Sequence, residues 1–261
     1  MKELAVCYQN RLLIETGPDI FAPAWFRESS QAWASLNGDE RDKLGKLIAR
    51  YFRDSEELWA KDGEKLLGFM KKAVPLLPCA EDLGVVPDSV PVVLERLGIL
   101  GLKIPRWTKR YREAGEPFIP PAEYPHLTVC AASVHDTTTL REWWETEPDK
   151  EGLWKSLGFC GEAPAAYSGE TAKKVFEGFL AAESVLVMFQ LQDVFALEEK
   201  FRSVYCADER INVPGTVTDT NWSYRMPFCL EDFDADNVLA KCVLSLVKKR
   251  KNKKLALRTA D

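Results

Sequence analysis

Two adjacent carboxylic acids, Glu81 and Asp82, directly follow the short apolar run 76–80. Such a pair allows a division of roles. In a dry cleft, burial raises the pKa of Glu81 so that it can act as a general acid, while a second carboxylate stays ionised. The alternative is structural: Glu81 caps the helix whose start is predicted at Pro87-Asp88-Ser89. Spacing alone leaves both interpretations open.

A second polar cluster is His135-Asp136, followed by Thr137-Thr138-Thr139; His135 is one of only two histidines. In the functional interpretation, the pair binds sugar hydroxyls and stabilises positive charge on a substrate. In the structural alternative, Asp136 or one of the threonines is the N-cap of the next helix, because Asp and Thr favour that position.

The third cluster surrounds a Pro-Gly turn, with Arg210-Ile211-Asn212 before it and Asn221-Trp222 after it. Carbohydrate sites often combine these residue types, because an aromatic face packs on a sugar ring. Ordinary loops combine them too. In contrast, Trp143-Trp144 fall on a predicted amphipathic helix, which indicates core packing.

Other reaction classes lack their motifs in this sequence. There is no nucleophile elbow, no G-x-G-x-x-G and no P-loop. The seven cysteines show no C-x-x-C spacing, which argues against a zinc site or a disulfide framework. We therefore expect no metal and no organic cofactor, and a reducing, cytoplasmic compartment.

The elements that must position these clusters alternate along the chain. Strand-length apolar runs alternate with helical stretches, which predicts an α/β fold with a parallel sheet or barrel. Polar clusters at the ends of the runs then meet on one face, where barrel enzymes keep their active sites. The runs are 76–80, 100–104, 127–132 and 185–191, and the predicted helices are 89–97, 137–145, 169–182 and 231–247.

The first part of the chain has a different pattern. Residues 1–38 lack periodicity apart from a turn signal at 17–19, and two helices are predicted, at 40–53 and from the cap Ser55 to just before Pro75. We expect a helical segment at 1–75, a catalytic part at 76–248 and a basic, solvated tail at 249–261.

Composition sets outer limits. The chain has 261 residues, 46% hydrophobic and 29% charged, with a net charge of −5. This suits one large globular domain or barrel and argues against a nucleic-acid binder. No signal peptide and no membrane-spanning run is predicted. The sequence makes no prediction of oligomeric state.

In chain order, several segments together resemble glycoside hydrolase family 77, the amylomaltase or disproportionating-enzyme family. The resemblance is close over residues 76–230, and the stretches 128–131, 139–145 and 161–164 look like the plant cytosolic branch and its microbial relatives. The matching segments are Ala80-Glu81-Asp82-Leu83-Gly84, Leu100-Gly101-Leu102-Lys103-Ile104, Ser133-Val134-His135-Asp136 with Thr139-Leu140-Arg141-Glu142-Trp143-Trp144, Leu191-Gln192-Asp193, and Arg210-Ile211-Asn212-Val213-Pro214-Gly215-Thr216 with Asn221-Trp222.

The resemblance implies a retaining 4-α-glucanotransferase on a modified (β/α)8 barrel, acting on α-1,4-glucans or maltose. It implies that Glu81 is the general acid/base and Asp136 the acid that stabilises the transition state. His135, Asp82, Asn221 and Trp222 are the implied substrate-binding residues.

The family's nucleophilic aspartate lies in an Arg-Ile-Asp-His type motif upstream of the acid/base glutamate. No such motif occurs in this chain, and the aspartates before residue 81 stand in other contexts. Retention needs both carboxyl groups. We therefore expect the C-terminal portion of an incomplete barrel, hence a fragment. The alternative is a non-catalytic remnant that binds glucan or a partner.

Overall fold

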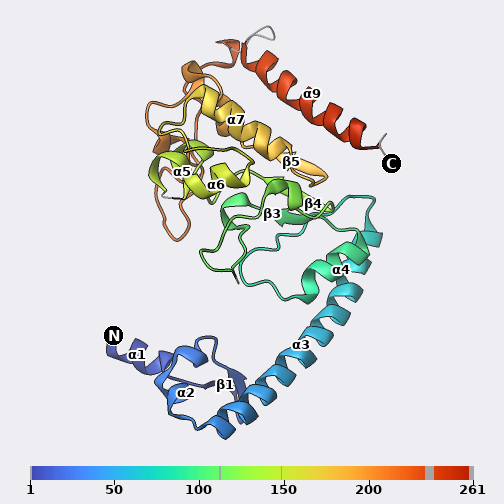
Figure 1. Ribbon diagram of the computed structural model, residues 1–261, viewed down its shortest axis with the longest axis vertical. Helices are drawn as coiled ribbons and strands as arrows, with labels where there is room; N and C mark the ends of the chain where they lie inside the picture. The colour runs from blue at the N-terminus through green and yellow to red at the C-terminus, as the bar shows by residue number, and fades with distance from the viewer. Residues whose placement is uncertain (1, 112, 148, 233–237, 259–261) are drawn as a thin grey trace. The chain divides into compact units, whose positions relative to one another are not determined.

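The computed structural model describes residues 2–111, 113–147, 149–232 and 238–258. The chain divides into two compact units. One comprises residues 1–74 and 87–93, and the other residues 75–86 and 94–261. Figure 1 shows the elements of each unit along the chain.

A parallel sheet forms the centre of the second unit. Its strands are β3 (Gly101–Lys103), β4 (Thr128–Ala131) and β5 (Leu186–Met188), in the order β3-β4-β5. Both pairings are parallel. A parallel bridge from Cys79 to Leu100 brings the segment 76–80 alongside β3. The predicted apolar runs are therefore confirmed as neighbours in one sheet, which is open among the described residues.

The two faces of this sheet have different surroundings, as β4 illustrates. Cys130 and Ala132 are buried in the main hydrophobic core. Val129 and Ala131 alternate with them and point the other way, because successive residues of a strand face opposite sides, and they line a hollow.

Helices pack on the core face. They are α5 (Leu140–Thr146), α6 (Lys150–Ser156), α7 (Gly169–Leu180), α8 (Leu191–Phe195) and α9 (Val238–Arg258). The core contains Trp143 and Trp144, so the prediction that they are core residues is confirmed. Trp144 contacts Trp154 edge to face, with ring centroids 5.9 Å apart.

The helix predicted at 231–247 is shifted. A 3₁₀ turn covers Leu230–Asp232, and α9 begins at Val238; residues 233–237 lie outside the described part. The α9 helix continues into the basic run, where the Arg250 guanidinium donates to the carbonyls of Leu180, Ala182 and Ser184 at 2.6–2.9 Å. These include the last carbonyl of α7, which has no partner within its own helix.

The other 3₁₀ turns are Arg27–Ser29, Pro105–Trp107, Pro121–Glu123, Glu199–Phe201 and Cys206–Glu209.

The first unit has more order than the sequence predicts. It contains α1 (Lys2–Gln9), an antiparallel hairpin of β1 (Leu13–Gly17) and β2 (Ile20–Pro23), and α2 (Gln31–Ser35). The turn signal at 17–19 connects the two strands. None of the described helices has the length and apolar character needed to span a membrane.

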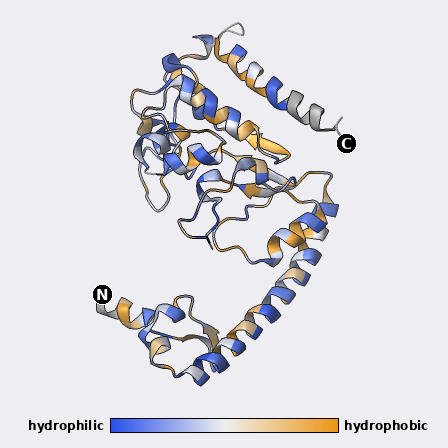
Figure 2. Cartoon of the chain, viewed as in Figure 1, coloured by the Kyte–Doolittle hydropathy of each residue, from blue (hydrophilic) through white to orange (hydrophobic). Residues whose placement is uncertain are grey.

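One long helix, α3 (Gly38–Ala73), replaces the two predicted helices. Its start is correct, because Asn37 forms a capping box with Glu40. The predicted break at Ser55 is wrong: no Gly or Pro interrupts residues 46–62, so the helix continues through the serine. Helix α4 (Ser89–Leu97) follows as predicted. In Figure 2, orange residues gather on α4 and on β5.

Candidate functional site

The polar clusters that the sequence singled out lie at one edge of the sheet. The segment 76–80, β3, β4 and β5 run parallel as neighbours, so their carboxyl ends share an edge. Glu81 follows the first strand-like segment and Asp136 follows β4, with β3 between them. Neighbouring strands lie about 4.8 Å apart, so the segment 76–80 and β4 are separated by roughly 10 Å.

Glu81 has an exposed side chain. The dry cleft expected for its carboxyl group is therefore not provided by the residues that the structure describes. The helix-cap alternative is wrong, because the start of α4 has another partner: the backbone N–H groups of Asp88 and Ser89 donate to Glu56, at 3.2 and 3.0 Å. The general-acid role stays a prediction.

Asp82 lies beneath this position, with a side chain only 4% exposed. Its Oδ1 accepts from the backbone N–H of Leu102 at 2.6 Å, and its Oδ2 accepts from Lys103 Nζ at 3.1 Å. Through these two hydrogen bonds, Asp82 attaches the segment containing Glu81 to β3. The contact with sugar expected of Asp82 stays a prediction.

This fastening depends on a glycine. A Cβ on Gly101 would lie 3.0 Å from Asp82 Oδ2. Gly101→Ala is expected to displace the carboxylate, leave the Leu102 N–H poorly paired and lower the free energy of unfolding by about 1–3 kcal/mol. Urea titration followed by circular dichroism measures the change.

The matched control is Gly45→Ala inside α3, where an added Cβ meets nothing within 4 Å. There the same substitution should raise stability by about 0.5–1 kcal/mol, because alanine favours the helix. If both variants shift stability in the same direction, the contact between Gly101 and Asp82 is not a tight one.

His135 and Asp136 lie in the loop after β4, and both are exposed. His135 Nε2 is 3.5 Å from Asp136 Oδ2. The alternative that Asp136 caps α5 is wrong; the cap is Thr139, whose hydroxyl accepts from the Glu142 N–H at 3.3 Å. A threonine was among the alternatives that the sequence left open. Asp136 is therefore available for another role.

The loop after the 3₁₀ turn Cys206–Glu209 joins this pair. Asn212 donates from Nδ2 to Asp136 Oδ1 at 2.6 Å, and its backbone N–H donates to the His135 carbonyl at 3.2 Å. The Trp222 ring lies 5.1 Å from the His135 ring, centroid to centroid. The structure thus brings three predicted site residues, His135, Asp136 and Trp222, into one cluster.

Trp222 is held in an unusual conformation. Its φ is +62°, which bulky residues rarely adopt. Its N–H donates to the Ile211 carbonyl at 2.7 Å, and its side chain is nevertheless 65% exposed. A strained backbone that presents an aromatic face to solvent is a feature of binding sites.

Asn221, the remaining predicted residue, closes its own loop. Its Oδ1 accepts from the Val213 N–H at 3.1 Å, and its Nδ2 donates to the Thr216 carbonyl at 3.1 Å. Both ends of the amide are engaged within the described chain, so its observed contribution is to shape the loop before Trp222. A glucan contact stays a prediction.

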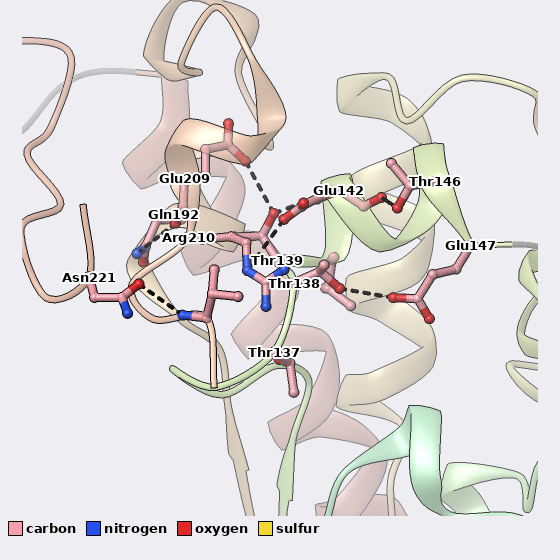
Figure 3. A network of polar contacts seen from close by, with 12 residues as sticks. Thr137, Thr138, Thr139, Glu142, Thr146, Glu147, Gln192, Glu209, Arg210 and Asn221 are labelled. Atoms are coloured by element: carbon pink, nitrogen blue, oxygen red, sulfur yellow. Dashed lines mark hydrogen bonds and ion pairs between the residues drawn. The ribbon is translucent and has the colours of Figure 1, made fainter. Parts of the chain in front are cut away.

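A network of polar contacts links the segment 137–147 to Glu209 and Arg210 (Figure 3). Arg106, with a side chain 8% exposed, donates to the Thr138 carbonyl at 2.7 Å and to Glu147 at 3.3 Å. Burial lowers the pKa of Arg106, and the charge of Glu147 opposes that shift.

Glu209 forms the other part of the network. Its carboxylate accepts from Arg141 at 2.8 Å and from the Thr139 hydroxyl at 3.3 Å, and its carbonyl accepts from Gln192 at 3.2 Å. Burial raises the pKa of Glu209, while Arg141 acts against that shift. The network therefore ties the loop after β4 to the loop that carries Asn212 and Trp222.

A hollow of about 440 Å³ adjoins this cluster on the open face of the sheet. His135 lies at its polar end, and Leu102, Val129 and Met188 line its apolar part. The Met188 side chain is 55% exposed. A mostly apolar space that includes a polar group such as the His135 imidazole is typical of a ligand site.

Sequence reasoning missed Asn212, Arg106 and Glu209 as contributors. Asn212 stood inside a segment that had been singled out, and Arg106 follows the second strand-like run, 100–104, at the same edge. The hydrogen bonds between these three residues and the loop after β4 join positions at least 32 apart in sequence. The hydrogen bond from Gln192 to the Glu209 carbonyl joins closer positions. No local pattern indicates such pairings.

Comparison with known proteins gives a consistent match. Residues 26–231 match a family model described as 4-alpha-glucanotransferase. The 4-alpha-glucanotransferase DPE2 of Oryza sativa subsp. japonica is 31% identical over 244 residues, which cover 92% of this chain and 25% of the rice protein. A 4-alpha-glucanotransferase of Chlamydia pneumoniae is 33% identical over 183 residues, 70% of this chain and 34% of that protein. The chain thus spans well under half of these relatives.

A solved structure shares the fold. The amylomaltase of Streptococcus agalactiae, solved in complex with acarbose, superposes with a TM-score of 0.55. The match covers 72% of this chain and 35% of the amylomaltase, at 22% sequence identity. The predicted α/β class is confirmed, as is the predicted similarity to a plant enzyme of this family.

Proposed function

Because the chain belongs to the 4-alpha-glucanotransferase family, glycoside hydrolase family 77, we propose that it carries the acid/base and charge-stabilising part of a glucan-transfer site. The reaction moves glucosyl or maltosyl units between α-1,4-glucans. The observation that carries this proposal is the cluster of His135, Asp136 and Trp222, held by Asn212 at the carboxyl edge of the sheet. The sheet corresponds in this proposal to the C-terminal portion of a (β/α)8 barrel.

The proposed roles follow from chemistry. Glu81 protonates the departing glycosidic oxygen, and later removes a proton from the acceptor hydroxyl. Asp136 stabilises positive charge that develops on the sugar ring, and Asn212 fixes the direction of its carboxylate. His135 donates to a sugar hydroxyl, and Trp222 supplies an aromatic face.

The nucleophile comes, in this proposal, from outside the 261 residues. A covalent glycosyl intermediate needs a carboxylate about 5–5.5 Å from the acid/base group, and no aspartate of this chain stands in the family's nucleophile motif. This observation favours one alternative: a protein that binds glucan without transferring it. Transfer assays, described in the Discussion, separate the two.

Binding of acarbose to residues 1–261 tests the shared premise that the cluster contacts glucan. Isothermal titration calorimetry should detect binding, and Trp222→Ala should weaken it about tenfold, because losing a packed aromatic face costs roughly 1–2 kcal/mol. Trp25→Ala is the matched control, since Trp25 is exposed to a similar extent, 70% against 65%, but lies in the other unit. Equal losses in the two variants, or no binding at millimolar acarbose, would overturn the proposed site.

A further inference from the structure

Asp193 is a buried carboxylate that touches both ends of the loop after β4. It lies on α8, just after β5, and its exposed fraction is 0%. One oxygen, Oδ2, accepts from the Ser133 hydroxyl. The other, Oδ1, accepts from the backbone N–H of Leu140 at 2.8 Å. Ser133 lies two residues after the end of β4 and Leu140 begins α5, so the segment between them is the one that contains His135 and Asp136.

We propose that Asp193 is a positioning residue that fixes the loop 134–139 from beneath, and thereby holds His135 and Asp136 toward the glucan. The inference rests on the proposed function for its glucan-binding consequence, but not for the fixing of the loop. Asp193 does not touch substrate, because it has no exposed surface.

The shape of the side chain explains why an aspartate suits this position. Two polar groups, a hydroxyl and a backbone N–H, point at one short side chain, and a carboxylate offers an acceptor to each. An apolar residue would leave the Leu140 N–H buried and unpaired, which is costly. An asparagine could keep both contacts, since Oδ1 still accepts from Leu140 and the Ser133 hydroxyl can rotate to accept from Nδ2.

Packing alone does not explain why a carboxylate stands at this buried position. Burial raises the pKa of Asp193 to about 6, while its hydrogen bonds from Ser133 and Leu140 and the charge of Arg106 oppose the shift. Glu209 and Tyr167 also face it, and the charge of Glu209 raises the pKa further. A buried, mostly ionised group costs stability at neutral pH, so the contacts of Asp193 with the loop explain an aspartate here better than packing does.

Further contacts leave the loop with little other freedom. Arg106 holds the Thr138 carbonyl, and Glu209 holds the Thr139 hydroxyl. Both lie at the α5 end of the loop. At the β4 end, Ser133 is bound by Asp193 and Val134 N–H donates to the Thr137 hydroxyl within the loop. Asp193 is thus the group that links the β4 end of the loop to its α5 end.

Hydrogen exchange on the full chain, read by mass spectrometry, tests the loop. Asp193→Ala should speed the exchange of peptides covering 134–140 at least tenfold, with α7 peptides changed less than twofold. Asp193→Asn should restore exchange to within about threefold of wild type. In parallel, Asp193→Ala should weaken acarbose binding about tenfold, and Asp193→Asn should recover most of it.

The control sits at the other end of the same strand. The Thr128 hydroxyl donates to the Pro125 carbonyl at 2.6 Å and lies 2.7 Å from the Ser184 hydroxyl, also buried. Thr128→Val should leave the exchange of 134–140 and acarbose affinity within twofold. If it matches Asp193→Ala, or if exchange rises equally in α7, Asp193 only stabilises the fold and the inference is wrong.

Two further outcomes remain decisive. If Asp193→Ala does not fold, Ser133→Ala, which removes one contact and keeps the carboxylate, should still speed exchange of 134–140 about threefold or more; no change there contradicts the inference. If the wild-type chain binds no acarbose, the proposed function fails, while the exchange data still decide whether Asp193 fixes the loop.

Discussion

Replacing Glu81 by glutamine is expected to lower the rate of glucan transfer by roughly 10²–10⁴-fold, the usual contribution of general acid–base catalysis. Glutamine keeps the shape of the side chain but cannot give up a proton to the glycosidic oxygen. The measurement is made in a polypeptide that contains both these residues and a nucleophilic aspartate. Maltotriose is the substrate, and released glucose is followed by chromatography. Acarbose affinity should stay within about threefold, because Glu81→Gln removes chemistry rather than a binding surface.

The choice of leaving group sharpens this test. Fluoride departs from α-maltosyl fluoride without a proton, so the loss in formation of the glycosyl intermediate should be much smaller with this donor than with maltotriose. Glu95→Gln, an exposed glutamate of α4, is the control and should keep full activity. Equal losses with both donors would show that Glu81 positions the substrate and is not the acid.

Residues 1–261 alone are expected to produce no disproportionation of maltotriose. In the proposed function Glu81 supplies a proton and Asp136 stabilises charge, and the family resemblance assigns neither of them the attack on the anomeric carbon. A substituting carboxylate would have to approach that carbon to about 3–3.5 Å. The open sheet adds a structural reason. The residues that line the hollow beside His135 all belong to the sheet and its adjoining segments, so the described residues form only one wall of the hollow.

The assay incubates the chain with maltotriose and follows glucose together with longer maltodextrins. Release of glucose with a matching rise in longer chains would identify a nucleophile within these residues, and would remove the non-transferring alternative. Acarbose binding without transfer is the expected pattern. Adding a polypeptide that carries the family's nucleophile segment and its upstream strands is the stringent positive control, since regained transfer would assign the missing chemistry to that segment.

Period and length of the apolar runs predicted the sheet of the second unit well. Runs near 76–80, 100–104, 127–132 and 185–191 are adjacent parallel strands or a bridged segment, and a continuous apolar sequence is typical of parallel strands. The polar residues that follow these runs lie at one edge of the sheet, as predicted, while their role in a site stays a prediction. Helix termini were less predictable: Thr139, not Asp136, caps α5, since several adjacent cap-forming residues compete and tertiary contacts select one.

The support behind the site was beyond prediction. Asp193 was noted only as part of a motif, and its partners Ser133 and Leu140 lie 60 and 53 positions away. The hold of Asn212 on Asp136 spans 76 positions. Local propensity carries no information about such pairs. In the first unit, the predicted helix break at Ser55 was wrong for a local reason. A serine that can cap a helix does not end one when no Gly or Pro stands beside it.

Two hydroxyl contacts, one at each end of β4, have a consequence for insertions and deletions. Thr128 meets Ser184 before β5, and Ser133 meets Asp193 after it. The ladder between β4 and β5 has only Val129 with Leu186, Cys130 with Val187, and Ala131 with Met188. So short a ladder has few backbone hydrogen bonds to fix its register, and a slip by one residue would reverse the faces of the strand. The two contacts fix the strand register, because both can form together only if the intervals 128–133 and 184–193 keep their lengths relative to one another. Homologous chains should therefore tolerate length changes in the connections outside these intervals far more readily than a single added or lost residue within them.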